Sequence, residues 1–250
     1  MFVTSFAQPD PHPYRRPSTS NTSGDRAGGQ RSLPGLATQA TASHVLEPFV
    51  PGSATINYTR DEEIIAQDEG AEYGFQVVSG CVRTVRLLED GRRQVGEFLM
   101  SGDLFGWETG PDNAFGAEAV TPVTLYRFHL RTLEEKAATD SCFARKLRQH
   151  AGAQMRRMRS QLVLLGRKTA FERIASFLVD MGERLHAEAE PALELPMSRT
   201  DIADYLGMTI ETVCRGLSEL RHRGTITVER SRIVVCDRRA LGVAGSDRLH

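Results

Sequence analysis

Cysteine is scarce in this 250-residue chain, and the four cysteines stand far apart. Cys81, Cys142, Cys214 and Cys236 are never closer to one another than 22 residues. Zinc sites and iron–sulfur clusters need ligands at short spacing, such as Cys-x-x-Cys, and no such pattern occurs. We therefore expect no metal site and no cofactor, and we expect reduced thiols that mostly pack as small apolar side chains.

Long apolar runs and the common signatures of enzymes are also missing. No stretch approaches the roughly 20 apolar residues of a membrane span, and no secretory signal core follows Met1. The chain contains no glycine-rich phosphate loop and no nucleophile elbow. These absences predict a cytoplasmic protein with no membrane partner, and they make an enzyme the least favoured class.

Large apolar residues are few in the first 44 positions, which are rich in Pro, Gly, Ser, Thr and Arg. Such a segment cannot bury enough apolar surface to offset the entropy of ordering it, so residues 1–44 are predicted to be a disordered extension. A transit peptide is the alternative interpretation, but the prolines would break the amphipathic helix that such peptides need.

From residue 45 to 132 the chain has the pattern of many short strands. The β-prone runs 74–79, 81–88 and 95–100 are separated by turns that contain glycine. Asp90-Gly91 is a dipeptide typical of a tight hairpin. Short strands without intervening helices predict a β-sandwich or barrel, a domain that by itself indicates no function.

Helical periodicity replaces this pattern between residues 133 and 168. Six residues at spacings of three or four form one apolar stripe: Leu147, Ala151, Met155, Met158, Leu162 and Leu165. Because such spacing is typical of a coiled-coil seam, we predict a dimerisation helix. The alternative is that the stripe packs on the chain's own β-domain. A second amphipathic helix is expected over 169–185, and an acidic, proline-containing loop over 186–195.

Residues 198–223 have the pattern of two short helices joined by a tight turn. Ser198 is a candidate N-cap of the first helix, Gly207 allows the left-handed conformation that ends it, and Thr209 can cap the second. The second helix has an apolar face (Val213, Leu217, Leu220) and a polar face (Glu211, Cys214, Arg215, Ser218, His222). These faces suit insertion into the major groove of DNA, although any pair of amphipathic helices joined by glycine would look similar.

Two β-prone runs, 225–228 and 232–235, follow directly and predict a small hairpin, or wing. Residues 209–239 contain seven arginines and four acidic residues, a net charge of +3 in a chain whose total is −1. Local positive charge of this kind fits a focused phosphate-binding face. We predict a winged helix-turn-helix over 169–240 and a flexible tail over 241–250. The predicted DNA contacts are Thr209, Ile210, Glu211, Cys214, Arg215, Ser218, Arg230 and Arg232.

A β-domain, a long dimerisation helix and a winged helix-turn-helix, in this order, resemble the Crp/Fnr superfamily of transcription regulators from residue 45 to 239. The resemblance is strongest where the Glu-x-x-Ser-Arg core of Fnr-type proteins appears as Glu211-Thr212-Val213-Cys214-Arg215. The segment looks most like the FixK branch. The resemblance implies an α+β fold with an N-terminal β-roll of the cyclic-nucleotide-binding kind. It also implies a homodimer that mainly activates micro-oxic, nitrogen-fixation or denitrification genes, with double-stranded DNA and RNA polymerase as partners.

In that family the Glu and Arg read a G·C pair in each half of a TTGAT–ATCAA palindrome, which implies the same roles for Glu211 and Arg215. Cys214 stands where the family usually has Ser. An exposed thiol beside Arg215 makes Cys214 a candidate redox switch, because its oxidation would place negative charge against DNA. A simple van der Waals contact between the thiol and a base is the alternative, and it has at least equal weight.

Two departures from the family limit what the β-domain can bind. Fnr proper holds an iron–sulfur cluster through clustered N-terminal cysteines, and this chain has no cysteine before Cys81. Crp-type domains hold a nucleotide phosphate with a Gly-Glu-Leu segment and an Arg-Ser pair, but no Lys or Arg occurs here between Phe98 and Tyr126. That stretch instead contains Asp103, Glu108, Asp112 and Glu118. A phosphate bound there would lack a positively charged partner. We therefore expect the β-domain to be a scaffold that contacts RNA polymerase. A receptor for a cyclic nucleotide or another effector is the alternative.

Overall fold

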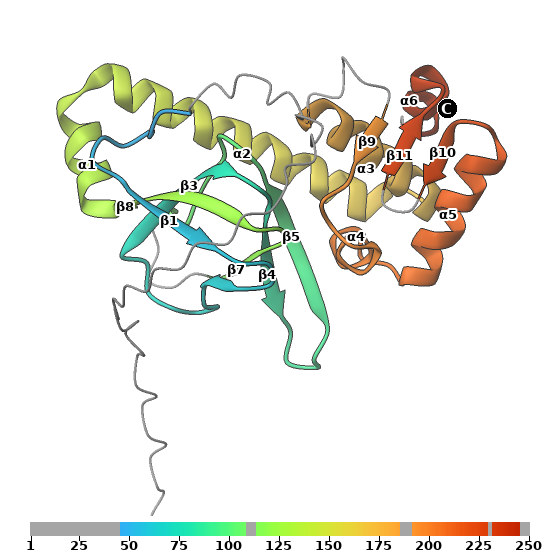
Figure 1. Ribbon diagram of the computed structural model, residues 1–250, viewed down its shortest axis with the longest axis horizontal. Helices are drawn as coiled ribbons and strands as arrows, with labels where there is room; N and C mark the ends of the chain where they lie inside the picture. The colour runs from blue at the N-terminus through green and yellow to red at the C-terminus, as the bar shows by residue number, and fades with distance from the viewer. Residues whose placement is uncertain (1–45, 109–113, 186–191, 230–231, 246–250) are drawn as a thin grey trace, which may run out of the picture. The chain divides into compact units, whose positions relative to one another are not determined.

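The computed structural model describes residues 46–108, 114–185, 192–229 and 232–245. The predicted disordered extension, the wing residue Arg230 and the last five positions lie outside these ranges. The fold is α+β, as predicted: a β-roll comes first, two helices follow, and a winged helix-turn-helix ends the described chain (Figure 1).

The β-roll consists of two four-stranded antiparallel sheets. One sheet has the order β1 (Ala54–Tyr58), β8 (Val123–His129), β3 (Tyr73–Ser79) and β6 (Leu104–Phe105). The other has the order β2 (Glu63–Ile65), β7 (Gly116–Ala119), β4 (Val82–Leu87) and β5 (Arg93–Leu99). Alternate residues of both sheets, such as Val123 and Leu125 on β8 and Ala117 and Ala119 on β7, are buried between them. Alternation of buried and exposed positions is what a two-sheet core requires.

The predicted Asp90-Gly91 hairpin joins β4 to β5. The backbone of Gly91 has a φ of 82°, and its N–H donates to the carbonyl of Leu88. A positive φ is open to glycine at no steric cost, which explains why glycine suits this position in the turn between the two strands.

The helical region predicted from residue 133 is two helices, α1 (Leu130–Thr139) and α2 (Ser141–Arg167). Asp140 interrupts them because its backbone is extended (φ −121°, ψ 101°) and its side chain accepts from the N–H groups of Cys142 and Phe143. An aspartate at this position therefore caps α2, and its side chain satisfies donors that a continuous helix would have satisfied with backbone carbonyls. Figure 1 shows α2 passing alongside the β-roll.

The C-terminal domain contains α3 (Ala170–Arg184), α4 (Arg199–Leu206) and α5 (Ile210–His222), followed by the wing strands β10 (Ile226–Glu229) and β11 (Arg232–Val235). Both wing strands agree with the prediction from the sequence. Two further elements differ from it. A short strand, β9 (Ala192–Glu194), pairs with β11 in a segment predicted to be a loop. A helix, α6 (Arg238–Gly245), occupies the first part of the predicted flexible tail.

Both unpredicted elements depend on contacts with distant parts of the chain. Ile233 of β11 stands opposite Leu193 of β9, and a three-residue strand has no periodicity of its own. The carbonyl of Gly245 at the end of α6 accepts from Lys168 and from the hydroxyl of Ser176. Local propensity is a weak guide where tertiary contacts of this kind decide the conformation.

The β-roll and the C-terminal domain share one apolar cluster. Phe98 of β5, Phe177 of α3 and Tyr205 of α4 form its aromatic part, with ring centroids 5.2 to 6.3 Å apart. Phe98 and Phe177 are almost completely buried. Among the residues described, no helix is long and apolar enough to cross a membrane.

Candidate nucleic-acid interface

The turn between α4 and α5 is built from local signals in the sequence. Ser198 caps α4 and forms a capping box with Asp201, in which each side chain bonds the other residue's backbone N–H. Gly207 ends α4 in the left-handed conformation, with φ 60° and ψ 48°. Thr209 caps α5 by accepting from the N–H of Thr212. All three predicted roles are confirmed, and together they set where α5 begins.

The two faces of α5 differ as the sequence predicts. Val213, Leu217 and Leu220 are buried in the domain core. Glu211, Arg215 and Ser218 are exposed, as are Thr209 and Ile210 at the start of the helix, and Cys214 is half-buried. Five of these residues line a shallow hollow on the surface: Ile210, Glu211, Cys214, Arg215 and Ser218. Their grouping on one side gives α5 an open face of mixed donors and acceptors.

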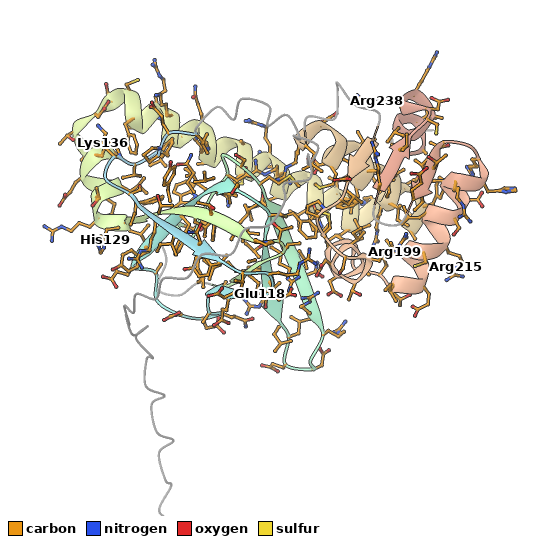
Figure 2. The ribbon with its side chains drawn as sticks, viewed as in Figure 1. Glu118, His129, Lys136, Arg199, Arg215 and Arg238 are labelled. Atoms are coloured by element: carbon orange, nitrogen blue, oxygen red, sulfur yellow. The ribbon has the colours of Figure 1, made fainter. Side chains whose placement is uncertain are left out.

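Glu211 is an ionised hydrogen-bond acceptor on this face. Hydrogen bonds from its own backbone N–H and from the Thr209 hydroxyl lower the pKa of its carboxyl below the ordinary value, with a smaller contribution from Arg215. In the part of the chain that the structure describes, no carboxylate lies within ion-pairing distance of Arg215. Arg215 projects from α5 at the surface (Figure 2). A free guanidinium beside an ionised carboxylate suits bidentate readout of base edges.

The wing supplies a second exposed cation. Arg232 begins β11 and is exposed, whereas Arg230 lies outside the described residues. Arg223 at the end of α5 is instead paired with Glu219, one turn earlier, at 2.7 Å. The predicted contacts on α5 and the described wing residue therefore lie in one small domain, on elements that follow one another closely along the chain.

The predicted dimerisation stripe divides into two groups on α2. Leu147 and Leu165 are half-buried against apolar clusters of their own chain. Met155, Met158 and Leu162 are 51, 58 and 72% exposed, which is high for large apolar side chains. The two ends of the stripe thus pack on the chain's own domains, as the alternative interpretation predicts. The middle of α2 presents an uncovered apolar surface of the kind that a dimer seam would use.

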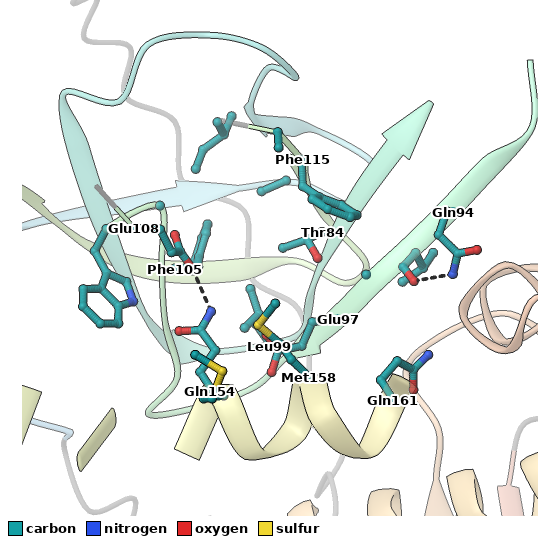
Figure 3. Close-up of a pocket in the computed structure, with 18 of the residues that line it drawn as sticks. Thr84, Gln94, Glu97, Leu99, Phe105, Glu108, Phe115, Gln154, Met158 and Gln161 are labelled. Atoms are coloured by element: carbon teal, nitrogen blue, oxygen red, sulfur yellow. Dashed lines mark hydrogen bonds between the residues drawn. The ribbon is translucent and has the colours of Figure 1, made fainter. Parts of the chain in front are cut away.

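The same helix closes a cavity of about 750 Å³ in the β-roll. Figure 3 shows Gln154, Met158 and Gln161 of α2 facing Thr84, Leu99 and Phe105 of the roll. The described lining contains no Lys or Arg, and its charged residues are Glu97 and Glu108. Glu97 is paired with Arg157, and Glu108 accepts from the side-chain amide of Gln154 at 2.7 Å. The cavity is therefore mainly apolar.

The acidic residues expected around this cavity have different surroundings. Glu108 lines it, and Asp112 lies outside the described residues. Asp103 accepts from Arg184, with Arg157 also nearby, and Glu118 is paired with Arg83. Because these carboxylates are paired with arginines, they would repel a phosphate less than the sequence suggests. The described lining of the cavity nevertheless offers a phosphate no positively charged partner.

Comparison with known proteins agrees with this architecture. Residues 55–140 match the family described as "Cyclic nucleotide-binding domain", and residues 172–243 match "Crp-like helix-turn-helix domain". The chain is 45% identical over 188 residues to the nitrogen fixation regulation protein FixK of Azorhizobium caulinodans, covering 74% of this chain and 76% of that protein. FixK of Rhizobium meliloti is 44% identical over 177 residues, covering 71% of this chain and 80% of that protein. The chain belongs to the Crp/Fnr superfamily.

Within the Crp/Fnr superfamily it lies in the FixK-like branch, a group of helix-turn-helix transcription regulators. The solved structure of FixK2 from Bradyrhizobium japonicum superposes with a TM-score of 0.74 at 42% identity, covering 78% of this chain and 98% of that chain. The likeness thus extends over the β-roll, α2 and the helix-turn-helix together.

One group of residues near the helix-turn-helix of this Crp/Fnr protein was not predicted from the sequence. Asp201, the partner of Ser198 in the capping box, also binds Arg83 and Arg93 of the β-roll. Burial would raise the pKa of Asp201, but bonds from Ser198 and the charges of Arg83 and Arg93 outweigh it and hold that pKa below the ordinary value. No spacing signal could have revealed this, because Arg83 and Asp201 are 118 positions apart.

Proposed function

We propose that this chain is a homodimeric, sequence-specific DNA-binding activator that acts in the cytoplasm. The observation that carries the proposal is the open face of α5, where Glu211 and Arg215 are exposed on the side opposite the buried apolar residues. The target is a palindrome of TTGAT–ATCAA type, with one recognition helix in the major groove of each half. The names of the FixK relatives support nitrogen-fixation genes as targets, and the resemblance to the FixK branch extends this to genes of micro-oxic metabolism or denitrification.

Each predicted contact has a role that its chemistry supports. Arg215 and Glu211 read the two members of a G·C pair, since a guanidinium matches the acceptors of guanine and a carboxylate accepts from cytosine. Thr209, Ile210, Cys214 and Ser218 contact neighbouring base edges or the sugar–phosphate backbone. Arg230 and Arg232 of the wing bind phosphate, which supports affinity without sequence preference.

The dimer follows from the limited reach of one reading helix. A single module that reads four or five base pairs cannot reach specific affinity, whereas two modules about one helical turn apart can. The uncovered surface of Met155, Met158 and Leu162 on α2 supports this helix as the contact between the two copies. The remaining residues of the proposed seam are Leu147, Ala151 and Leu165. RNA polymerase is the proposed second partner, with the β-roll as the scaffold that contacts it.

The decisive test measures binding to two duplexes at one fixed salt concentration. The first contains the palindrome, and the second has the G·C pair of each half replaced by A·T. Each mismatch is expected to weaken binding by about 1–3 kcal/mol, so the second duplex should bind at least tenfold more weakly. Equal binding of both duplexes would contradict groove reading by α5.

A small-molecule receptor is a second candidate function, favoured by the cavity beside α2. Its size suits a small ligand, and the buried indole N–H of Trp107, which lines it, has no hydrogen-bond partner among the described residues. The apolar lining without a cation favours an apolar ligand with one acceptor over a nucleotide. Calorimetric titration with cyclic AMP and cyclic GMP should give no binding heat; saturable binding of either would establish a cyclic-nucleotide receptor instead.

A further inference from the structure

A cluster of ionic side chains connects the β-roll to the first helix of the helix-turn-helix. We define the Arg–Asp cluster as Arg83 of β4 and Arg93 of β5 together with Asp201 and Asp204 of α4. Arg93 donates from Nε to Asp204 Oδ2 at 2.8 Å and from Nη2 to Asp201 Oδ1 at 2.7 Å. Arg83 donates from Nη1 to the same oxygen of Asp201 at 3.1 Å.

The partners on both sides are themselves held in place. Arg83 stands opposite Glu118 in the register of β4 and β7, and its Nε donates to that carboxylate at 2.8 Å. The second oxygen of Asp201 accepts from the backbone N–H and the hydroxyl of Ser198, at 3.0 and 2.7 Å. The side chains of Arg83 and Asp201 are only 10 and 4% exposed. Each charge thus has several fixed partners and little freedom to move.

Buried ion pairs of this kind contribute more to geometry than to net stability. The cost of desolvating the charges offsets most of their attraction, whereas their hydrogen bonds are strongly directional. The adjacent contact between Phe98 and Tyr205 is apolar and tolerates sliding because burial has no preferred direction. The apolar cluster therefore holds the two domains together, and the Arg–Asp cluster determines how α4 is turned on the roll.

A second attachment holds the other end of α4. Arg173 donates to the carbonyl of Leu206, the last residue of α4, at 3.0 Å and to that of Leu165 on α2 at 2.8 Å. The Arg–Asp cluster holds the helix at its third and sixth residues, Asp201 and Asp204. Two separated attachments determine the direction of a helix axis, and α5 follows α4 through a turn of three residues.

We propose that Arg83, Arg93, Asp201 and Asp204 are positioning residues that set which half-site spacing the protein accepts. The proposal rests on the proposed function, since spacing has a meaning only for a dimer that reads two half-sites. If α4 is held in one orientation on each β-roll, the two α5 helices are a fixed distance and angle apart. The second half-site is then bound at high effective concentration at one spacing and poorly at others.

The experiment compares three palindromes. In the first the half-sites have the spacing of the TTGAT–ATCAA palindrome, and in the other two they are one base pair closer or one base pair further apart. Each base pair moves a half-site by about 3.4 Å and turns it by roughly 35°. The wild-type protein should bind the altered spacings at least tenfold more weakly. Asp204→Asn, which weakens one of the bonds of Arg93, and Arg93→Gln, which breaks its bonds to both Asp201 and Asp204, should each reduce this ratio several-fold. The double variant should reduce it no further than Arg93→Gln alone, because Arg93→Gln already removes the partner of Asp204.

A single half-site provides the readout that distinguishes positioning from damage. The affinity for a single half-site should be unchanged in both variants, because the reading face of α5 is intact. A loss of folded protein would instead weaken binding to every duplex by the same factor and leave the spacing ratio unchanged. Arg92→Gln is the matched control: Arg92 is the neighbouring arginine of the same hairpin, it is 77% exposed and it pairs with Asp90. This variant should keep the wild-type spacing ratio.

The possible results separate the two proposals. A wild-type protein that discriminates spacing, together with variants that keep the full ratio, would overturn the positioning role and leave the proposed function intact. A wild-type protein that binds the palindrome no better than one half-site would overturn both. Should Arg93→Gln fail to fold, Asp204→Asn, which alters a single atom of a less buried carboxylate, decides the question.

Discussion

At the scale of single residues, the exposed face of α5 combines a small number of side chains with separate tasks. Glu211 and Arg215 are charged and exposed, and neither has an ion-pair partner among the described residues, whereas Arg223 on the same helix is paired with Glu219. Arg232 is exposed on the wing, which carries no base-reading helix. Exposure and pairing in the structure therefore distinguish residues that can read bases from residues that can only add charge.

Replacing Arg215 with alanine should relax discrimination at one G·C pair in each half-site. The expected cost is about 1–3 kcal/mol for each bidentate pair of hydrogen bonds that the alanine removes. Arg232→Ala should instead weaken binding to all sequences about equally and flatten the dependence on salt. Affinities for matched and mismatched duplexes over a range of salt concentrations test both. If the two variants behave alike, Arg215 binds phosphate and reads no base.

Peroxide should abolish DNA binding through Cys214, a half-buried thiol that lines the surface hollow together with Glu211 and Arg215. Oxidation to a sulfinate would set a bulky negative charge against phosphates and base-edge acceptors. In a gel-shift assay Cys214→Ser should bind and ignore peroxide, and Cys214→Asp should not bind.

Two outcomes would argue against this role. Inhibition of Cys214→Ser as strongly as of the wild type would assign the effect to another group, of which the exposed Cys142 and Cys236 are the accessible thiols. Cys81 is a poor candidate, because burial raises the pKa of its thiol to about 12 and keeps it protonated. Full activity of the wild type after peroxide would leave Cys214 as a simple packing contact.

At the scale of elements, α2 has two surfaces with different roles. Its side toward the β-roll carries Gln154 and Arg157, which bond to Glu108 and Glu97, two residues that line the apolar cavity. Met158 and Leu162 also border this cavity, yet more than half of each side chain is exposed. A partner helix laid along α2 would cover these side chains and close the cavity further.

Replacing Met158 and Leu162 together with glutamate should give a folded monomer with weak DNA binding. Because both side chains are exposed within one chain, the change should cost little folding stability, whereas two like charges would meet in a dimer seam. Light scattering measures the oligomeric state. Val163→Glu is the control, since Val163 is 47% exposed but lies outside the stripe, and it should remain dimeric. A dimer in the double variant would rule out this seam.

At the scale of the whole molecule, the β-roll and the helix-turn-helix are joined by polar and apolar contacts between distant segments. Phe98, Arg83 and Arg93 of the roll meet α3 and α4 in the same region. The position of α4, and with it that of α5, therefore depends on contacts with the roll. Asp201, at 4% exposure, is the most buried charged residue of the Arg–Asp cluster.

The contribution of Asp201 to stability should depend on pH in a defined direction. Its pKa in the folded protein lies below the ordinary value of 3.8, so the unfolded chain takes up the proton first as the pH falls. The stabilisation is complete well above pH 3.8 and is lost as the pH falls through that value toward the folded pKa.

Asp201→Asn should therefore lower the free energy of unfolding by about 3 kcal/mol at pH 7, because it leaves Arg83 and Arg93 short of a buried partner. The difference from the wild type should shrink below about pH 4 in urea titrations. Asp90→Asn, a change in an exposed hairpin carboxylate, is the control and should show little effect at neutral pH. A difference that stays constant from pH 7 to pH 3 would contradict the assigned role.

The sequence by itself determined the features that depend on neighbouring residues. Ser198, Gly207 and Thr209 specify caps and a turn through bonds to positions within three or four residues, and Asp90-Gly91 specifies a hairpin in the same way. The apolar spacing of α5 specifies its buried face. These local signals, in their order along the chain, were enough to predict the α+β fold and the exposed candidates on α5.

Only the tertiary structure decided the features that depend on distant residues. Leu193 becomes part of a strand because Ile233 stands opposite it, and α6 forms where Gly245 meets Lys168 and Ser176. The two ends of the stripe on α2, Leu147 and Leu165, pack on apolar clusters of the same chain, whereas Met155, Met158 and Leu162 between them border the cavity and stay exposed. Asp201 has the sequence pattern of a simple capping residue, yet it pairs with Arg83 from 118 positions away, since sequence periodicity carries no information about which buried charges will pair across domains.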